Sequence, residues 1–224
     1  MHILLTRPLE DCSEMILRFK SLGHQVSHLP LLDIVGVDYD EIIFSDFKSI
    51  IFTSSNAVKF LNVKTIDKKI LCFCVGNATE KKARSIGFQN VIAAEGNVEN
   101  LKELILQNFD QKEGKLIYVS GKSISIDLDN QLLQEGYDIK RIINYQTNHN
   151  IKFDQNFIEA LKLNIPDMVY VYSQNSALSF LKFIKNYQLK NLWMNTNLMC
   201  IGEKTSAILN EIKWKKIFLF NPGE

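Results

Sequence analysis

Hydroxyl and amide side chains recur in two similar stretches of this sequence, each placed directly after a short apolar run. Residues 53–56 (TSSN) follow Ile50-Ile51-Phe52, and residues 173–176 (SQNS) follow Tyr170-Val171-Tyr172. Each order predicts a buried strand, a turn and the first turn of a helix. A helix start has unpaired backbone N–H groups and a partial positive charge, so each junction could hold an anion. The alternative is that these side chains only cap their helices.

Loops of the same kind follow other predicted strands and carry further candidates for ligand binding. The sequences of these loops are TRP, GNAT, SGKS and GEKT. Together with the two stretches above, they give the candidate binding residues Thr6, Arg7, Ser54, Ser55, Asn56, Gly76, Thr79, Ser120, Gly121, Ser173, Gln174, Asn175, Lys204 and Thr205.

Tyr145 differs from these residues because it stands where a predicted strand gives way to the polar segment NYQTNHNIK. A phenol has a pKa of about 10, which suits hydrogen bonding to a departing hydroxyl group. The alternative for Tyr145 is a packing role between two domains.

Standard catalytic and metal-binding motifs are absent from the sequence. It contains no HExxH, CxxC, G-x-S-x-G, Walker or G-x-G-x-x-G pattern, and residues 120–123 (SGKS) lack the earlier glycine of a phosphate-binding loop. His2, His24, His28 and His149 are scattered, so no metal site is expected.

Composition describes an ordinary globular chain without a strong electrostatic field. Of 224 residues, 46% are apolar and 23% charged, and the formal net charge is +1, which favours neither nucleic acid nor an acidic membrane. A polyanionic ligand would therefore need local donors. No signal peptide or membrane span is apparent, which predicts a cytoplasmic protein, and the four cysteines are expected to be buried free thiols.

Strands alternate with helices along the whole chain, which predicts parallel sheets with helices on both faces. Strands are expected at Val26–Ile34 and Ile139–Tyr145, and helices at Glu80–Ile86 and Ser206–Ile212 after the turns GNAT and GEKT. The final part has three strands, and the N-terminal pair would complete its sheet. We therefore expect one domain from residues 1–36 and 148–224, and a second from residues 39–145 inserted into it. Residues 36–39 and 145–150 would link them, and the strand-end loops would line a shared cleft.

The ordered set ILLTRP, IIFTSSNAV, CVGNATEKKARSIGF, KLIYVSG, INYQT, VYVYSQNSAL and CIGEKTSAIL resembles the uroporphyrinogen-III synthase family over nearly the whole chain. The resemblance implies an α/β fold of two flavodoxin-like, parallel-sheet domains joined by a two-stranded linker, the first domain being discontinuous.

The resemblance also implies a function: cyclisation of hydroxymethylbilane, a linear tetrapyrrole with eight carboxylates, to uroporphyrinogen III with inversion of the last ring and loss of water. No cofactor or metal is implied. Tyr145 matches a tyrosine thought to assist departure of the hydroxyl group, and Ser54, Thr79, Ser173 and Thr205 match hydroxyl positions at strand ends. A monomer in transient contact with hydroxymethylbilane synthase, the preceding enzyme, completes the expectation.

Two departures and two alternatives accompany the resemblance. Asn56 stands where some relatives have a basic residue, and only residues 221–224 (NPGE) follow the last predicted strand, where the resemblance implies a terminal helix. A non-catalytic two-domain protein that binds small anions is the alternative function. A nucleotide-sugar transferase would need acidic or histidine residues in its cleft that the sequence does not identify.

Overall fold

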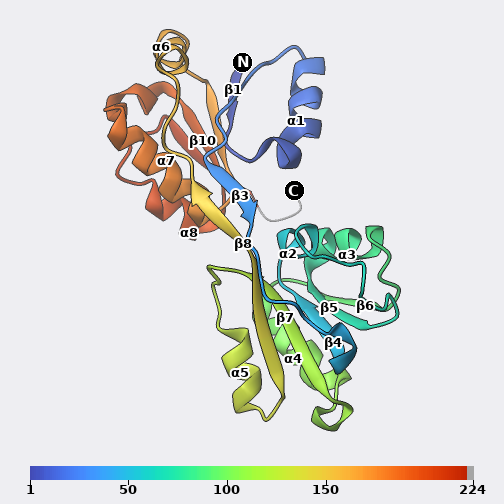
Figure 1. Cartoon of the computed structure of the whole chain (residues 1–224). Helices are drawn as coiled ribbons and strands as arrows, with labels where there is room; N and C mark the ends of the chain where they lie inside the picture. The colour runs from blue at the N-terminus through green and yellow to red at the C-terminus, as the bar shows by residue number, and fades with distance from the viewer. Residues whose placement is uncertain (221–224) are drawn as a thin grey trace. The chain divides into compact units, whose positions relative to one another are not determined.

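The computed structural model describes residues 1–220, and the chain divides into two compact units. Unit 1 contains Met1–Asp33 and Asn148–Glu224, and unit 2 contains Ile34–Thr147. Both are α/β units with parallel sheets (Figure 1). No helix within residues 1–220 has the length and apolar character that crossing a membrane requires. Residues 221–224, where the sequence departs from the terminal helix of the family, lie outside the described residues.

Unit 1 is built on a five-stranded sheet in the order β11-β10-β9-β1-β2, and every neighbouring pair is parallel. The strands are β1 (His2–Leu5), β2 (Gln25–His28), β9 (Met168–Val171), β10 (Asn197–Ile201) and β11 (Lys216–Phe220). The helices are α1 (Leu9–Ser21), α6 (Gln155–Leu163), α7 (Gln174–Asn186) and α8 (Gly202–Ile208), with a 3-10 helix at Lys190–Asn195.

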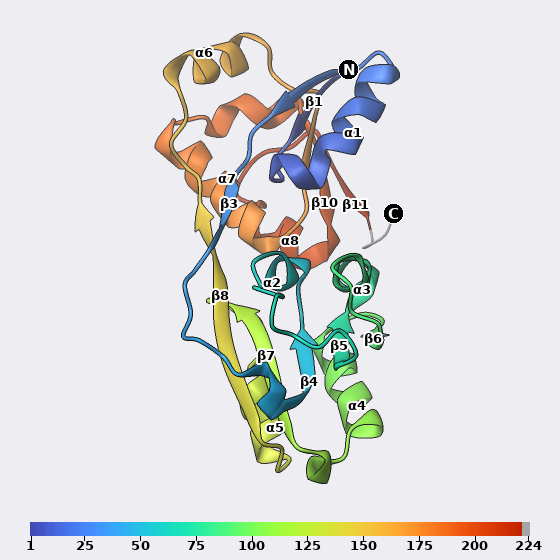
Figure 2. The same cartoon turned by 45° about the vertical axis from the view of Figure 1, so that its right-hand side comes forward.

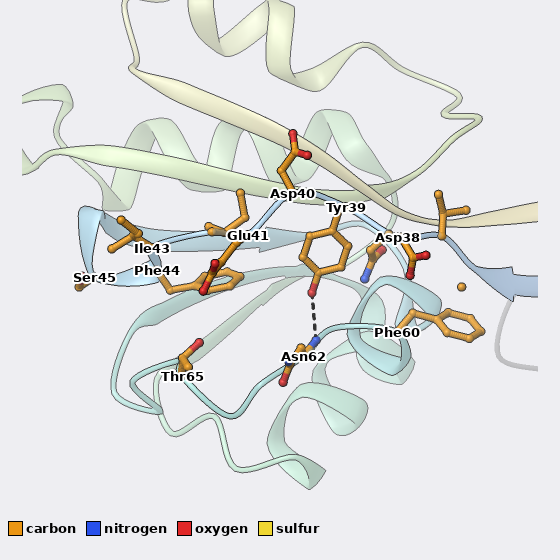
Figure 3. A pocket seen from close by; sticks show the side chains of 14 residues that line it. Asp38, Tyr39, Asp40, Glu41, Ile43, Phe44, Ser45, Phe60, Asn62 and Thr65 are labelled. Atoms are coloured by element: carbon orange, nitrogen blue, oxygen red, sulfur yellow. Dashed lines mark hydrogen bonds between the residues drawn. The ribbon is translucent and has the colours of Figure 1, made fainter.

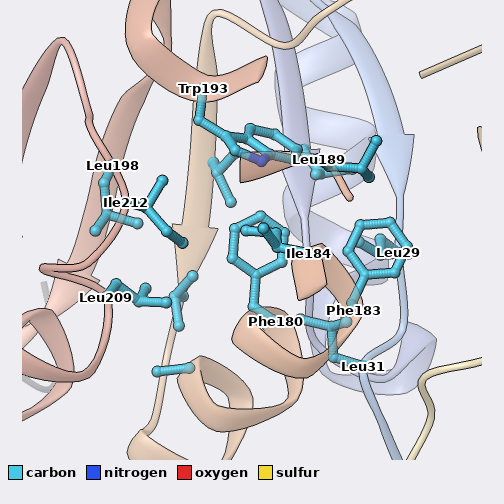
Figure 4. Close-up of a cluster of buried hydrophobic side chains, with 14 of the residues drawn as sticks. Leu29, Leu31, Phe180, Phe183, Ile184, Leu189, Trp193, Leu198, Leu209 and Ile212 are labelled. Atoms are coloured by element: carbon cyan, nitrogen blue, oxygen red, sulfur yellow. The ribbon is translucent and has the colours of Figure 1, made fainter. Parts of the chain in front are cut away.

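A hydrophobic cluster of aliphatic and aromatic side chains fills the core on one face of this sheet (Figure 4). Phe180 and Phe183 of α7 are fully buried, and the Phe180 ring meets Trp193 edge-on at 5.1 Å between centroids. On the opposite face, Ile3 and Leu5 of β1 pack with Cys12 of α1. Neighbouring residues of β1 point to opposite faces, and all four residues of the strand are buried because both faces are covered.

Unit 2 is built on a six-stranded sheet in the order β3-β8-β7-β4-β5-β6, in which β8, β7, β4, β5 and β6 pair in parallel. The strands are β3 (Leu32–Gly36), β4 (Phe47–Phe52), β5 (Leu71–Val75), β6 (Val91–Ala94), β7 (Lys115–Gly121) and β8 (Ile139–His149). The helices are α2 (Ser55–Lys59), α3 (Gly76–Ser85), α4 (Val98–Asn108) and α5 (Leu128–Gln134), with 3-10 turns at Phe44–Asp46 and Gln111–Glu113.

Alternation along β4 divides the core of unit 2 between the two faces of the sheet. Ile50 and Phe52 pack in the cluster that includes Ala57 of α2, whereas Ile51 packs in the cluster that includes Leu101 of α4. Both faces are therefore covered by helices, as expected for a parallel sheet.

Two predicted strands and two predicted helices were wrong in their bounds. The strand expected at Val26–Ile34 is two strands, β2 and β3, because Pro30 has no N–H to donate to a sheet. The strand expected to end at Tyr145 continues to His149, with Asn150 N–H donating to Leu31 C=O at 2.9 Å.

The third correction concerns the turns before α3 and α8. Both helices begin at the glycine itself, Gly76 and Gly202, so GNAT and GEKT are first turns of helices and not separate loops. Both glycines have positive φ, +73° and +66°, a conformation that few other residues adopt.

All four cysteines are free and buried, which confirms the expectation from the sequence. We predict that in the native protein the four thiols react with Ellman's reagent far more slowly than in concentrated guanidinium chloride. Burial raises the pKa of Cys74 to about 12 and of Cys200 to about 11, so little reactive thiolate forms near neutral pH. Rapid reaction of even one thiol before unfolding would contradict this burial.

Candidate functional site

The candidate residues of unit 2 gather at one edge of its sheet. The strands β8, β7, β4 and β5 are adjacent and parallel, so their carboxyl ends lie along the same edge (Figure 2). We call this edge the unit 2 rim; it carries Ser54, Ser55, Asn56, Gly76, Thr79, Ser120, Gly121 and Tyr145.

Ser54 caps α2 at the end of β4. Its side-chain oxygen accepts a hydrogen bond from the Asn56 N–H at 3.2 Å, and Ser55 and Asn56 are the first residues of the helix. The preceding Thr53 shares a 2.9 Å hydrogen bond with the Tyr118 hydroxyl group. Because α2 has only five residues, its macrodipole is small, and capping accounts for the observed contact of Ser54.

The ends of β5 and β10 repeat one local arrangement in the two units. A glycine with positive φ begins the helix, and an added Cβ would meet nothing within 4 Å at Gly76 or Gly202. Three residues later Thr79 and Thr205 are buried, at 4% and 3% exposure. Their side chains therefore face the protein, and what these junctions present outward is mainly backbone N–H.

Arg141 of β8 forms hydrogen bonds with the residues at the end of β7. Its Nε donates to Ser120 Oγ at 2.7 Å, and its Nη2 donates to the carbonyl oxygens of Gly121 at 2.9 Å and Lys122 at 3.5 Å. Ser120 is fully buried, so its hydroxyl group is used within the protein. The guanidinium also lies 5.9 Å from the centre of the Tyr118 ring.

The pKa values of two ionisable groups near Arg141, Tyr118 and Asp129, are raised. Burial raises the pKa of the Tyr118 phenol, with smaller opposing effects from Thr53 and Arg141. Burial also raises the pKa of Asp129 in α5, and a hydrogen bond with Asp127 raises it further, while Arg141 lowers it.

Tyr145 lies half-buried on β8 beside Gly121 of β7. Its ring stacks with Phe60 at 6.4 Å between centroids and 23° between planes, and its carbonyl oxygen accepts a bond from Lys122 N–H at 2.9 Å. The Tyr145 hydroxyl group has no hydrogen-bond partner within residues 1–220. Its neighbour Asn144 is fully buried and donates to the Ala57 carbonyl oxygen at 2.7 Å.

The candidates of unit 1 gather at the carboxyl ends of β1, β9 and β10, which are adjacent strands; we call this edge the unit 1 rim. Thr6 is buried and donates to the Tyr170 carbonyl oxygen at 2.6 Å. Arg7 lies 4.9 Å from the centre of the Tyr172 ring and forms a 3.5 Å ion pair with Asp11. Arg7 is thus a cation held at the rim by its contacts.

Ser173 caps α7, accepting a hydrogen bond from Ser176 N–H at 3.0 Å. Gln174 and Asn175 are exposed, and within the described part of the chain their side chains have no hydrogen-bond partner. Lys204 is exposed on the first turn of α8. The chain therefore offers free polar groups and one further cation at this rim.

Unit 2 has a cavity of about 880 Å³ (Figure 3), and its lining includes none of the residues that define the unit 2 rim. Residues 36–45 form much of its lining, and its carboxylates are Asp38, Asp40 and Glu41. Acidic lining repels an anion, so this cavity does not suit a carboxylate-rich ligand. Its lining includes Gly36, Phe60 and Asn144, of which Phe60 and Asn144 neighbour Tyr145 of the rim.

Sequence reasoning missed Phe60 and Arg141. Phe60 closes the stretch SSNAVKF, and Arg141 is a charged residue within the predicted strand Ile139–Tyr145. An arginine in such a strand signals a local polar partner. Within residues 1–220 no group of three or more His, Cys, Asp or Glu side chains is arranged to hold a metal ion.

The fold and rims together define an α/β protein with two parallel-sheet units and polar strand ends. The family model "Uroporphyrinogen-III synthase HemD" matches residues 13–219, and the chain belongs to this family.

The relatives agree with that assignment. The porphyrin biosynthesis protein HemD of Ruminiclostridium josui is 22% identical over 219 residues, covering 91% of this chain; the chain spans 42% of that protein's length. Uroporphyrinogen-III synthetase from Helicobacter pylori matches with a TM-score of 0.66 and 19% identity over 99% of this chain and 93% of that one. A mutant synthase from Thermus thermophilus matches with a TM-score of 0.60 and 15% identity over 97% and 92%. The predicted fold class is thereby confirmed.

We predict that Ser173→Ala lowers the free energy of unfolding by about 1 kcal/mol, because α7 loses the acceptor that pairs its Ser176 N–H. Asn175→Ala is the matched control at the same helix start, since the Asn175 side chain is exposed and should contribute only a few tenths of a kcal/mol. Urea unfolding followed by circular dichroism measures both. Equal effects of the two substitutions would show that Ser173 is not a cap.

Proposed function

We propose that this chain is a uroporphyrinogen-III synthase that converts hydroxymethylbilane to uroporphyrinogen III. The family match across residues 13–219 is the observation that carries the proposal. The hydroxyl group of the substrate leaves as water, producing an azafulvene. The terminal ring then attacks through its substituted carbon to form a spiro intermediate, which fragments and recloses with that ring inverted.

Tyr145 is the residue we propose to assist departure of the hydroxyl group. Its own hydroxyl group is free of partners within residues 1–220, so it is available to donate a hydrogen bond to a leaving oxygen. A phenol O–H is a weak acid, which suits a leaving group that needs only moderate help.

The carboxylates of the substrate are proposed to bind at the rims of both units. With eight carboxylates on the substrate and a formal charge of only +1 on the protein, binding must come from local groups. The helices α3 and α7, of ten and thirteen residues, begin at the rims and offer unpaired N–H groups. Arg7 and Lys204 add charge at the unit 1 rim.

The finer parts of the proposal concern organisation. We propose domains at residues 1–36 with 148–224 and at 39–145, a monomeric enzyme in the cytoplasm, and transient contact with hydroxymethylbilane synthase. In this role the protein holds a flexible polyacid in a near-attack geometry, since the free substrate tends to close without inversion. The family match favours this activity over a non-catalytic protein that binds small anions.

Incubation with enzymatically generated hydroxymethylbilane tests the activity. We expect porphyrin isomer III in excess over isomer I after oxidation and chromatography, because spontaneous closure produces the uninverted ring. A reaction without the protein measures that background. Isomer I alone, at the background rate, would contradict the proposed activity.

Tyr145→Phe is expected to lower turnover at least several-fold without loss of folding, because only the hydroxyl group is removed. The matched control is Tyr137→Phe in the same unit. Tyr137 donates to the Phe109 carbonyl oxygen at 2.9 Å inside the core, so its loss should reduce stability but not turnover. Unchanged turnover in Tyr145→Phe would leave Tyr145 a packing residue.

A further inference from the structure

Two glycines enclose an aromatic pair at the unit 2 rim. An added Cβ at Gly121 would lie 2.6 Å from Cζ and 2.9 Å from the hydroxyl oxygen of Tyr145. An added Cβ at Gly36 would lie 2.9 Å from Cδ1 of Phe60. Contacts below 3 Å are far inside the usual carbon–carbon separation of about 3.5–4.0 Å, so neither position has room for a side chain.

Neither glycine is required by backbone conformation, since Gly36 and Gly121 lack the positive φ of Gly76 and Gly202. Each position instead needs a residue without a side chain, because the Phe60 ring lies against Gly36 and the Tyr145 ring lies against Gly121. The Phe60 and Tyr145 rings then stack on each other between these two surfaces, 6.4 Å apart and 23° from parallel. Gly36 therefore faces the Phe60 ring, Phe60 stacks with Tyr145, and the Tyr145 ring faces Gly121.

Strand pairing and hydrogen bonds also fix the backbone beside Tyr145. The pairing of β7 with β8 changes register between Ser120 and Gly121, which sets Gly121 directly opposite Tyr145. Lys122 N–H donates to the Tyr145 carbonyl oxygen at 2.9 Å, and Arg141 binds the Gly121 carbonyl oxygen at 2.9 Å. Such a register shift re-aims the side chains that follow it.

The Tyr145 hydroxyl group contrasts with other tyrosines of the chain. Tyr118, Tyr137 and Tyr187 each hydrogen-bond through the phenol oxygen, whereas Tyr145 has no such bond within the described residues. Ring packing therefore controls where the free phenol points.

We propose that Gly121 and Phe60 are positioning residues that set the direction of the Tyr145 hydroxyl group. This inference rests on the proposed function for its consequence in catalysis, because it takes Tyr145 as the group that contacts the departing hydroxyl. Gly121 acts by the absence of a side chain, and Phe60 acts by stacking. A displacement of about 1 Å at a reacting group can cost up to about a hundredfold in rate.

The test combines Gly121→Ala with Tyr145→Phe in a double-mutant cycle on the full chain. Gly121→Ala is expected to lower kcat by about as much as Tyr145→Phe, with KM changed less than about twofold. The double variant should be no slower than Tyr145→Phe, because Gly121 acts only through that phenol. Additive losses, or full activity of Gly121→Ala when Tyr145→Phe is impaired, would overturn the positioning role.

A second series uses Phe60 and does not depend on Gly121→Ala folding. Phe60→Leu should lower kcat several-fold, whereas Phe60→Tyr keeps the stacked ring and should restore it. The control is Phe109→Leu, which breaks another aromatic pair of unit 2, with Tyr137 at the same 6.4 Å centroid separation, in the core. It should lower thermal stability without changing kcat. Equal kcat for Phe60→Leu and Phe60→Tyr would contradict the proposal.

A readout without substrate separates this inference from the proposed function. In protein labelled with 13C-tyrosine, the ring signal missing from Tyr145→Phe is assigned to Tyr145. We expect that signal to shift in Gly121→Ala and Phe60→Leu but hardly in Phe60→Tyr or Phe109→Leu. Normal activity of Tyr145→Phe would contradict the proposed catalytic role of Tyr145 but not the positioning role of Gly121 and Phe60. An unmoved Tyr145 signal in both Gly121→Ala and Phe60→Leu would overturn the positioning role alone.

Discussion

Parallel pairing of strands is the constraint on which the candidate site depends. When neighbouring strands run in the same direction, every crossover must return to the opposite end, so all the strand-to-helix junctions lie on one edge. In unit 2 this places Ser54, Gly76, Gly121 and Tyr145 together although they are far apart in the sequence. The apolar strands that enforce the pairing are buried on both faces, which leaves polar chemistry to the junctions.

The two units use similar junctions with unequal helices. Ser54 and Ser173 both cap the helix that follows their strand, and Gly76 and Gly202 both begin a helix with positive φ. The serine-capped helix has thirteen residues in unit 1 (α7) but only five in unit 2 (α2). The helix that begins at a glycine has ten residues in unit 2 (α3) but only seven in unit 1 (α8). Since unpaired N–H groups bind anions best at the start of a longer helix, the strongest anion-binding junction differs between the units.

The sequence predicts the local parts of this structure well and the long-range parts poorly. Apolar runs, caps such as Ser54 and Ser173, and the order of elements depend on neighbouring residues, so α/β class and strand-end polarity could be inferred. The helix starts at Gly76 and Gly202 were missed because a glycine in a sequence usually indicates a break, and both helices begin at the glycine itself. The burial of Thr79 and Thr205 follows from that shift and was equally hidden.

The contacts around Tyr145 were beyond sequence reasoning for a different reason. They join four segments, at Gly36, Phe60, Gly121 and Tyr145, and depend on a change of register between β7 and β8 that no periodicity reveals. A phenol fixed by a hydrogen bond inside the protein would have its proton or lone pairs already engaged. Packing against glycine and a second ring instead fixes direction while leaving the hydroxyl group free, which is what a weak acid directed at a departing oxygen requires.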